Sequence, residues 1–178
     1  MTYLRVDNML QLIGSYDPEK VLFEANRRFP ISDDGEYFTL WVGLLHLPTG
    51  SLSYASAGHP GALLSSAQSP SRWLTRSSFP LGFDPSAHFP CDRLSLKPAD
   101  RLFLLSDGIY EAPSSSGEVW GRDRFQEVID AGKQTSLSAT IRSSFSAARG
   151  WQQAQQFSDD AAVIGLELTD SPGRTFNG

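Results

Sequence analysis

The stretch TLWVGLLHLPTGSLSYASAGHP, residues 39–60, decides the fold class of this chain. Residues 37–47 are almost all apolar and rich in aromatic and branched side chains, which is typical of a buried strand. Pro48-Thr49-Gly50 then forms a tight turn, and the alternating residues after it predict the second strand of a hairpin. The chain is therefore expected to contain an antiparallel sheet.

Other apolar runs bounded by turn residues continue the β-structure along the chain. Residues 65–92 are rich in serine, proline and glycine, and we interpret them as a meander. Further strands are predicted at 62–64, 102–105 and 161–168.

Helices are predicted on both sides of this block, from apolar residues at helical spacing. Asp17 can act as an N-cap acceptor and Pro18 suits the first helical position, so a helix is expected to start there. The other predicted helices are one containing Val6, Met9, Leu10 and Ile13, one at 121–131 and one at 138–155. Helices, then strands, then helices and a last strand indicate an α+β layered fold.

Composition and charge exclude several classes of protein. The 178 residues suffice for one compact domain, assigned to 1–168, with 169–178 as a polar tail. The formal net charge of −5 gives no support for nucleic-acid binding. No apolar run is long enough to enter and cross a membrane, and no signal peptide is recognisable, so a cytoplasmic protein is expected. The single cysteine, Cys91, excludes an internal disulfide and a cysteine-based metal site.

Three polar clusters, at 58–60, 106–108 and 158–160, lie at the ends of predicted strands. Asp107 follows an apolar strand, and Asp159 with Asp160 precedes another. Carboxylates in such places suit a hard divalent cation such as magnesium or manganese. An Asp-Gly pair is equally a common turn, and paired aspartates can simply cap a strand. Taken one cluster at a time, the spacing favours this structural interpretation.

The order of these clusters along the chain resembles that of the PPM (protein phosphatase 2C-like) family. The resemblance is to its bacterial branch of stage II sporulation E-like and stress-response regulatory phosphatases. It covers nearly the whole chain up to about residue 168, and its strength lies in the ordered set of motifs. The matching pieces are 18–29, 43–60, 80–82, 97–102, 105–112, 117–122 and 158–160.

The resemblance implies two antiparallel sheets packed as a sandwich flanked by helices, with a binuclear manganese or magnesium site at one edge. Water activated by the metals, rather than an enzyme nucleophile, would attack phosphoserine or phosphothreonine. By resemblance, Asp107 and Asp159 match metal-ligand aspartates, and Asp160 stands beside the second one.

Three further residues match positions near such a site. Gly108 follows Asp107 in the Asp-Gly motif, and Gly58 with His59 matches a turn close to the metals. For His59 a structural role is favoured, because a histidine in a turn more often makes local hydrogen bonds than binds a metal.

One departure from the family pattern affects the expected activity. The family carries an Asp-x-x-Gly piece that supplies a metal-bridging aspartate, and none precedes the first predicted strand here. The resemblance therefore implies an N-terminally truncated domain without its first strands, and doubtful activity for this chain alone. Sheet edges left exposed in this way would favour pairing between chains, and hence a homodimer.

Three hypotheses remain open from the sequence. The first is a phosphatase domain whose partner is a phosphorylated protein of the anti-sigma-factor antagonist type. The second is a degenerate phosphatase fold that recognises a signalling partner without hydrolysis. The third is an unrelated α+β domain whose motifs match by chance. A metal-dependent phosphatase assay separates the first two.

Overall fold

The computed structural model describes residues 17–154 and 156–169. The chain divides into two compact units, which are described separately here. The first unit comprises Met1–Gly61 and Thr75–Leu96, and the second Ala62–Leu74 and Lys97–Gly178. The helix predicted around Val6–Ile13 and nearly all of the predicted tail lie outside the described residues. Within the described part of the chain, every helix is too short or too polar to span a bilayer.

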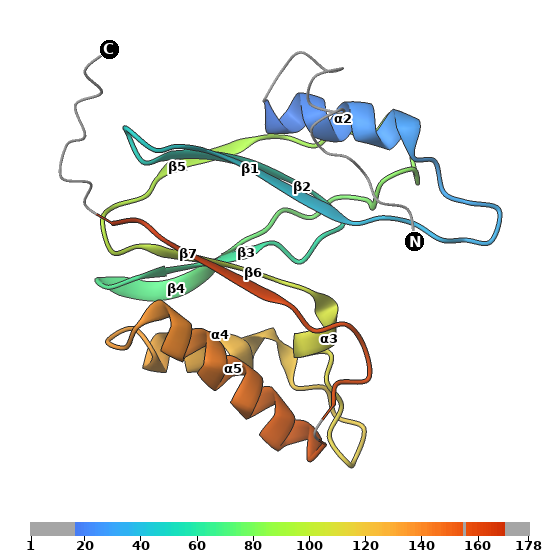
Figure 1. The fold of residues 1–178 in the computed structure, drawn as a ribbon. Helices are drawn as coiled ribbons and strands as arrows, with labels where there is room; N and C mark the ends of the chain where they lie inside the picture. The colour runs from blue at the N-terminus through green and yellow to red at the C-terminus, as the bar shows by residue number, and fades with distance from the viewer. Residues whose placement is uncertain (1–16, 155, 170–178) are drawn as a thin grey trace, which may run out of the picture. The chain divides into compact units, whose positions relative to one another are not determined.

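In its described residues, the first unit is a three-stranded antiparallel sheet with the helix α2 (Pro18–Arg28) (Figure 1). This helix starts as the sequence predicts, because Asp17 accepts a hydrogen bond from the Glu19 amide at 3.0 Å. The strand order is β1 (Leu40–His46), β2 (Ser51–Ala57) and β5 (Asp92–Ser95). The buried core of this unit consists of Val21, Leu22, Ala25, Ala55, Ala57, Leu81, Ala87 and Phe89.

The predicted hairpin of 37–57 forms with seven antiparallel residue pairs, from Leu40 opposite Ala57 to His46 opposite Ser51. On one face the Trp41 ring stacks on Tyr54, with ring centroids 5.8 Å apart. On the other face Leu40 and Val42 pack against the core beneath α2. The alternation of side chains along β1 therefore serves two different surfaces, which explains why this strand is apolar at nearly every position.

The second unit is a four-stranded antiparallel sheet covered by two helices (Figure 1). Its strand order is β4 (Ser69–Leu74), β3 (Ala62–Ser66), β6 (Arg101–Leu105) and β7 (Val163–Glu167). The covering helices are α4 (Gly121–Ala131) and α5 (Leu137–Gln152), and a single helical turn, α3 (Asp107–Tyr110), follows β6. The core of this unit consists of Leu63, Phe103, Leu105, Ile109, Ala112, Trp120, Phe125, Ile129 and Ala148.

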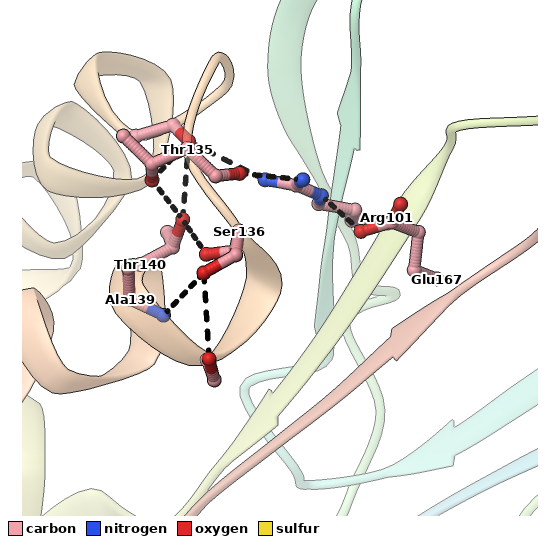
Figure 2. Close-up of polar contacts among 8 residues, drawn as sticks. Arg101, Thr135, Ser136, Ala139, Thr140 and Glu167 are labelled. Atoms are coloured by element: carbon pink, nitrogen blue, oxygen red, sulfur yellow. Dashed lines mark hydrogen bonds and ion pairs between the residues drawn. The ribbon is translucent and has the colours of Figure 1, made fainter.

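A polar network around Arg101 ties the α4–α5 connection to the sheet (Figure 2). The Arg101 guanidinium is 2.8 Å from the Glu167 carboxylate on the neighbouring strand and donates to the Thr135 carbonyl at 2.8 Å. Ser136 caps α5 by accepting from the Ala139 amide at 3.3 Å. The guanidinium thus satisfies a carbonyl that the turn before α5 leaves free.

The structure confirms the predicted α+β class with two antiparallel sheets and helices. It also shows where the sequence interpretation was wrong. The short strand β5 was not predicted, because its sequence Asp-Arg-Leu-Ser is half charged and looks like a loop. The last predicted helix ends earlier than expected, at Gln152, because Gln153 adopts a left-handed conformation with φ of 54°.

Candidate functional site

The two aspartate segments predicted to share a site adjoin one another in the second unit. Ser106, between β6 and α3, holds them together through three hydrogen bonds. Its hydroxyl donates to the Asp160 carbonyl at 2.7 Å and accepts from the Ala162 amide at 2.8 Å. Its backbone amide donates to the Ala162 carbonyl at 3.0 Å. The segment before β7 is therefore fixed against the end of β6 over a separation of more than fifty residues.

Gly108 allows this close approach. A Cβ atom at Gly108 would lie 2.6 Å from the Asp160 carbonyl oxygen and 2.8 Å from its carbonyl carbon. Contacts this short with backbone atoms force a shift of one segment or the other. The glycine of the Asp-Gly motif is thus required for packing against the Asp159-Asp160 segment as well as for turning the chain.

The three candidate carboxylates are all exposed to solvent. One oxygen of Asp107 accepts from the Gly108 amide at 3.0 Å, and one oxygen of Asp159 accepts from the Asp160 amide at 2.7 Å. Each of these two side chains is therefore oriented by the backbone that follows it. Oriented carboxylates at adjoining segment ends have the chemistry of ligands for a hard cation.

The number of ligands limits what these residues can hold. Among residues 17–154 and 156–169, no three histidine, cysteine, aspartate or glutamate side chains converge as a metal site would require. Magnesium is commonly bound by one or two carboxylates and completes its shell with waters and substrate phosphate. Asp107 and Asp159 have the chemistry of ligands used in that way, whereas a two-metal centre needs more carboxylates than these.

An aromatic side chain borders the same turn. Burial raises the pKa of the Tyr110 hydroxyl to about 12, and the negative charges of Glu111 and Asp107 add to this effect. Its hydroxyl therefore stays protonated at neutral pH. A neutral hydroxyl near Glu111 and Asp107 adds no further negative charge to this acidic turn.

The turn at Gly58 and His59 belongs to the first unit. The His59 ring accepts a hydrogen bond at Nδ1 from the Gly61 amide at 3.0 Å, and the His59 carbonyl accepts from the Ser56 hydroxyl at 3.0 Å. These are local contacts of the kind expected for a turn histidine. Because the aspartates lie in the second unit, a shared site with Gly58 and His59 stays a prediction.

Ser106 belongs to the 106–108 cluster, but no role was predicted for it from the sequence. A serine directly before an aspartate at a helix start suggests an N-cap, yet its side chain makes no capping bond to α3. The hydroxyl instead reaches Asp160 and Ala162, which are far away in the sequence. No local pattern specifies a partner at such a separation.

Comparison with known proteins gives the family context of this geometry. The family model for stage II sporulation protein E (SpoIIE) matches residues 5–169. Protein IcfG of Synechocystis sp. is 29% identical over 99 residues, which are 56% of this chain and 16% of that protein. The chain thus spans about a sixth of the length of this curated relative.

Two solved structures show the same fold. The SiaA-PP2C domain of Pseudomonas aeruginosa has a TM-score of 0.77 at 16% identity, covering 91% of this chain and 65% of that one. The phosphatase domain of SpoIIE from Bacillus subtilis, presoaked with manganese, has a TM-score of 0.68 at 16% identity, covering 98% and 77%. At these identities the likeness establishes the fold and leaves residue roles to be tested.

Proposed function

The chain belongs to the stage II sporulation protein E family of protein phosphatase 2C-like phosphatases, and on that premise we propose that it is a metal-dependent serine/threonine phosphatase domain. Its substrate would be a bacterial regulatory phosphoprotein of the anti-sigma-factor antagonist type. One observation carries the proposal for this chain: Ser106 holds the Asp107 and Asp159-Asp160 segments side by side.

Asp107 and Asp159 would hold a manganese or magnesium ion, with Asp160 at the adjacent position. When bound, such an ion supplies an activated water and neutralises charge on the phosphoryl group. The chain's own contribution is orientation, because the backbone bonds to Asp107 and Asp159 fix the direction of both carboxylates. Solvent exposure of the three aspartates leaves room for a phosphorylated loop of a protein substrate.

The small number of candidate metal ligands favours a second function, which is recognition of a phosphoprotein without hydrolysis. No three acidic or histidine ligands converge within the described residues, so the fold could recognise a phosphoprotein without hydrolysing it. In that case, binding of the partner would not depend on divalent cations. Hydrolysis and recognition are therefore separable by their metal dependence.

The experiment combines manganese binding with phosphate release. Calorimetry would follow manganese binding to the 178-residue chain, and release of phosphate from a phosphoserine peptide would report turnover. The test variant is Asp107→Asn, and the matched control is Asp33→Asn, an exposed loop aspartate of the first unit. The phosphatase proposal requires manganese binding by this chain that falls in Asp107→Asn and persists in Asp33→Asn. Any phosphate release should fall and persist in the same two variants.

The expected rate for this chain alone is low. Two-metal catalysis needs ions that both activate water and clamp the phosphoryl group, and the described residues bring together no third ligand. We expect little manganese-dependent hydrolysis of an aryl phosphate. A form extended at the N-terminus by an Asp-x-x-Gly segment should be active and lose that activity with Asp107→Asn. An extended form that binds the phosphoprotein but stays inactive would favour the recognition module.

A further inference from the structure

Arg124, near the start of α4, joins three segments of the second unit. Its guanidinium is 2.7 Å from the Glu118 carboxylate and donates to the Trp120 carbonyl at 2.9 Å. It also lies over the Trp151 ring near the end of α5, 4.0 Å from the ring centroid. The Trp151 indole in turn donates to the Glu118 carbonyl at 2.9 Å. The loop before α4, the start of α4 and the end of α5 are therefore tied together at one point.

One of these segments leads back to Asp107 through backbone hydrogen bonds. The Asp107 carbonyl accepts from the Glu111 amide at 2.8 Å. The Ala112 carbonyl accepts from the Trp120 amide at 2.9 Å, and the Trp120 carbonyl is the one to which Arg124 donates. The guanidinium therefore fixes the far end of the segment that begins with this candidate aspartate.

The end of α5 leads forward to Asp159, the second candidate aspartate. Phe157, which precedes it, packs on two side chains of α5. The Phe157 ring meets the Phe145 ring edge-on, with centroids 5.9 Å apart, and the Arg149 guanidinium lies over it at 5.6 Å. The segment before Asp159 is thus held against the helix whose end Arg124 contacts.

Two ties therefore connect the aspartate segments. Ser106 joins them beside the aspartates, and the contacts of Arg124 join their far ends. Carboxylates that share a cation repel each other in its absence, so the surrounding structure has to maintain their separation. Because the side chains of Asp107 and Asp159 are exposed, close packing around them cannot supply this restraint, whereas the two ties can.

We propose that Arg124 is a positioning residue for the candidate metal site, because it sets the separation of the segments that carry Asp107 and Asp159. This inference rests on the proposed function. The ion pair with Glu118 contributes little by itself, since the side chains of Arg124 and Glu118 are 39% and 58% exposed. The effect comes from the planar guanidinium, which binds a carboxylate and a backbone carbonyl while it stacks on an indole. A lysine at this position would keep the charge and lose this combination of contacts.

Arg101 provides a matched control in the same unit. It pairs with Glu167 and donates to the Thr135 carbonyl, so it also ties a loop next to a helix to another segment. Its side chain is only 12% exposed, so Arg101→Gln should lower the unfolding free energy at least as much as Arg124→Gln. Arg101 begins β6, whereas Asp107 follows the end of that strand. A role in stability alone predicts the larger loss of metal affinity for Arg101→Gln, and a positioning role predicts it for Arg124→Gln.

The test measures manganese affinity by calorimetry and, without metal, hydrogen exchange of the Ser106 and Ala162 amides, which join the two aspartate segments. Their exchange rates are compared with that of the Phe103 amide in the middle of β6, which reports general stability. In Arg124→Gln and Arg124→Lys, manganese affinity should fall about tenfold, the lower end of the effect of residues that orient metal ligands. Both amides should exchange faster relative to Phe103. Arg101→Gln should leave the affinity and the relative exchange rates unchanged.

Unchanged manganese affinity in Arg124→Gln would overturn the proposal, as would an equal fall in Arg101→Gln. If the unaltered chain binds no manganese, the proposed function fails, and the exchange rates decide this inference by themselves. Unchanged relative rates in Arg124→Gln then reject it, and faster rates support it. If Arg124→Gln does not fold, Trp151→Phe takes its place, because it keeps the ring and removes only the bond to the Glu118 carbonyl. Affinity and exchange should change in the same direction with this variant, and no change in either would also overturn the proposal.

Discussion

The turn at Gly58-His59 and the turn at Asp107-Gly108 are built in the same way, yet they leave different atoms available. In each turn one serine hydroxyl donates to a carbonyl and accepts from an amide of a second segment. Ser78 does so with the Ser56 carbonyl and the Gly58 amide, at 2.7 and 3.1 Å. Ser106 does so with the Asp160 carbonyl and the Ala162 amide, at 2.7 and 2.8 Å.

The difference lies in the side chain beside the glycine. In the first turn the His59 ring accepts from the Gly61 amide, so part of its bonding capacity serves the turn itself. In the second turn Asp107 uses one oxygen for the Gly108 amide, and the exposed carboxylate retains acceptor sites for a ligand. A polar residue next to a glycine at a strand end is therefore weak support for a functional site until its bonding is known.

Of the variants that test the difference between the two turns, Gly108→Ala should have the largest effect on stability. The added Cβ would overlap the Asp160 backbone, and we expect a loss of roughly 3 kcal/mol in unfolding free energy. Gly58→Ala is the matched variant, since its Cβ would lie 2.8 Å from the Pro80 backbone and Gly58 has φ of 66°. Urea unfolding would show both losses. Only Gly108→Ala should also weaken manganese binding, and equal weakening in both would contradict the distinction between the turns.

The second-largest expected effect is the loss of manganese affinity in Asp107→Asn. Asp107→Asn keeps the shape of the side chain and removes its charge, so manganese affinity should fall about a hundredfold, or roughly 2.8 kcal/mol. The unfolding free energy should change little, because the side chain is exposed. Calorimetry and urea unfolding of the same samples check both statements. Unchanged affinity would remove Asp107 from the site.

Ser106→Ala should have an intermediate effect, and it should lower both the unfolding free energy and the manganese affinity. It leaves the Asp160 carbonyl and the Ala162 amide without their partner, at a cost of about 1–2 kcal/mol. Ser106→Thr keeps the hydroxyl and serves as the control. Manganese affinity should fall in Ser106→Ala because the two aspartate segments separate. A fall in stability without any change in affinity would show that the serine holds the fold but not the site.

The sequence predicted the elements whose signal is local. Pro18 after Asp17 predicted the start of α2, and the pattern of 121–131 predicted α4 with its observed bounds. The charged strand β5 could not be predicted in this way, because it is a strand only through its pairing with β2. Its residues have no β-preference of their own, so tertiary context decides its structure.

The candidate site shows the same limit. Asp107 and Asp159 could be selected from motif order, but the bonds that bring their segments together come from Ser106 across the fold. The resemblance to a family predicted which residues belong to the site, and the hydrogen bonds of Ser106 supply the physical reason why their segments adjoin. How many ligands a cation would find is a three-dimensional property that neither spacing nor motif order contains.

The smallest expected effect is that of His59→Ala, and it tests the comparison most directly. Removing the ring leaves the buried Gly61 amide without its acceptor, which should cost about 1 kcal/mol of unfolding free energy. Manganese affinity should stay at the unaltered value, because the ring serves the turn. Calorimetry would measure manganese affinity in both variants, with Asp107→Asn as the reference because it should lose about a hundredfold in affinity. If His59→Ala lost affinity to a similar degree, the two turns would belong to one metal site, and the structural role assigned to His59 would be wrong.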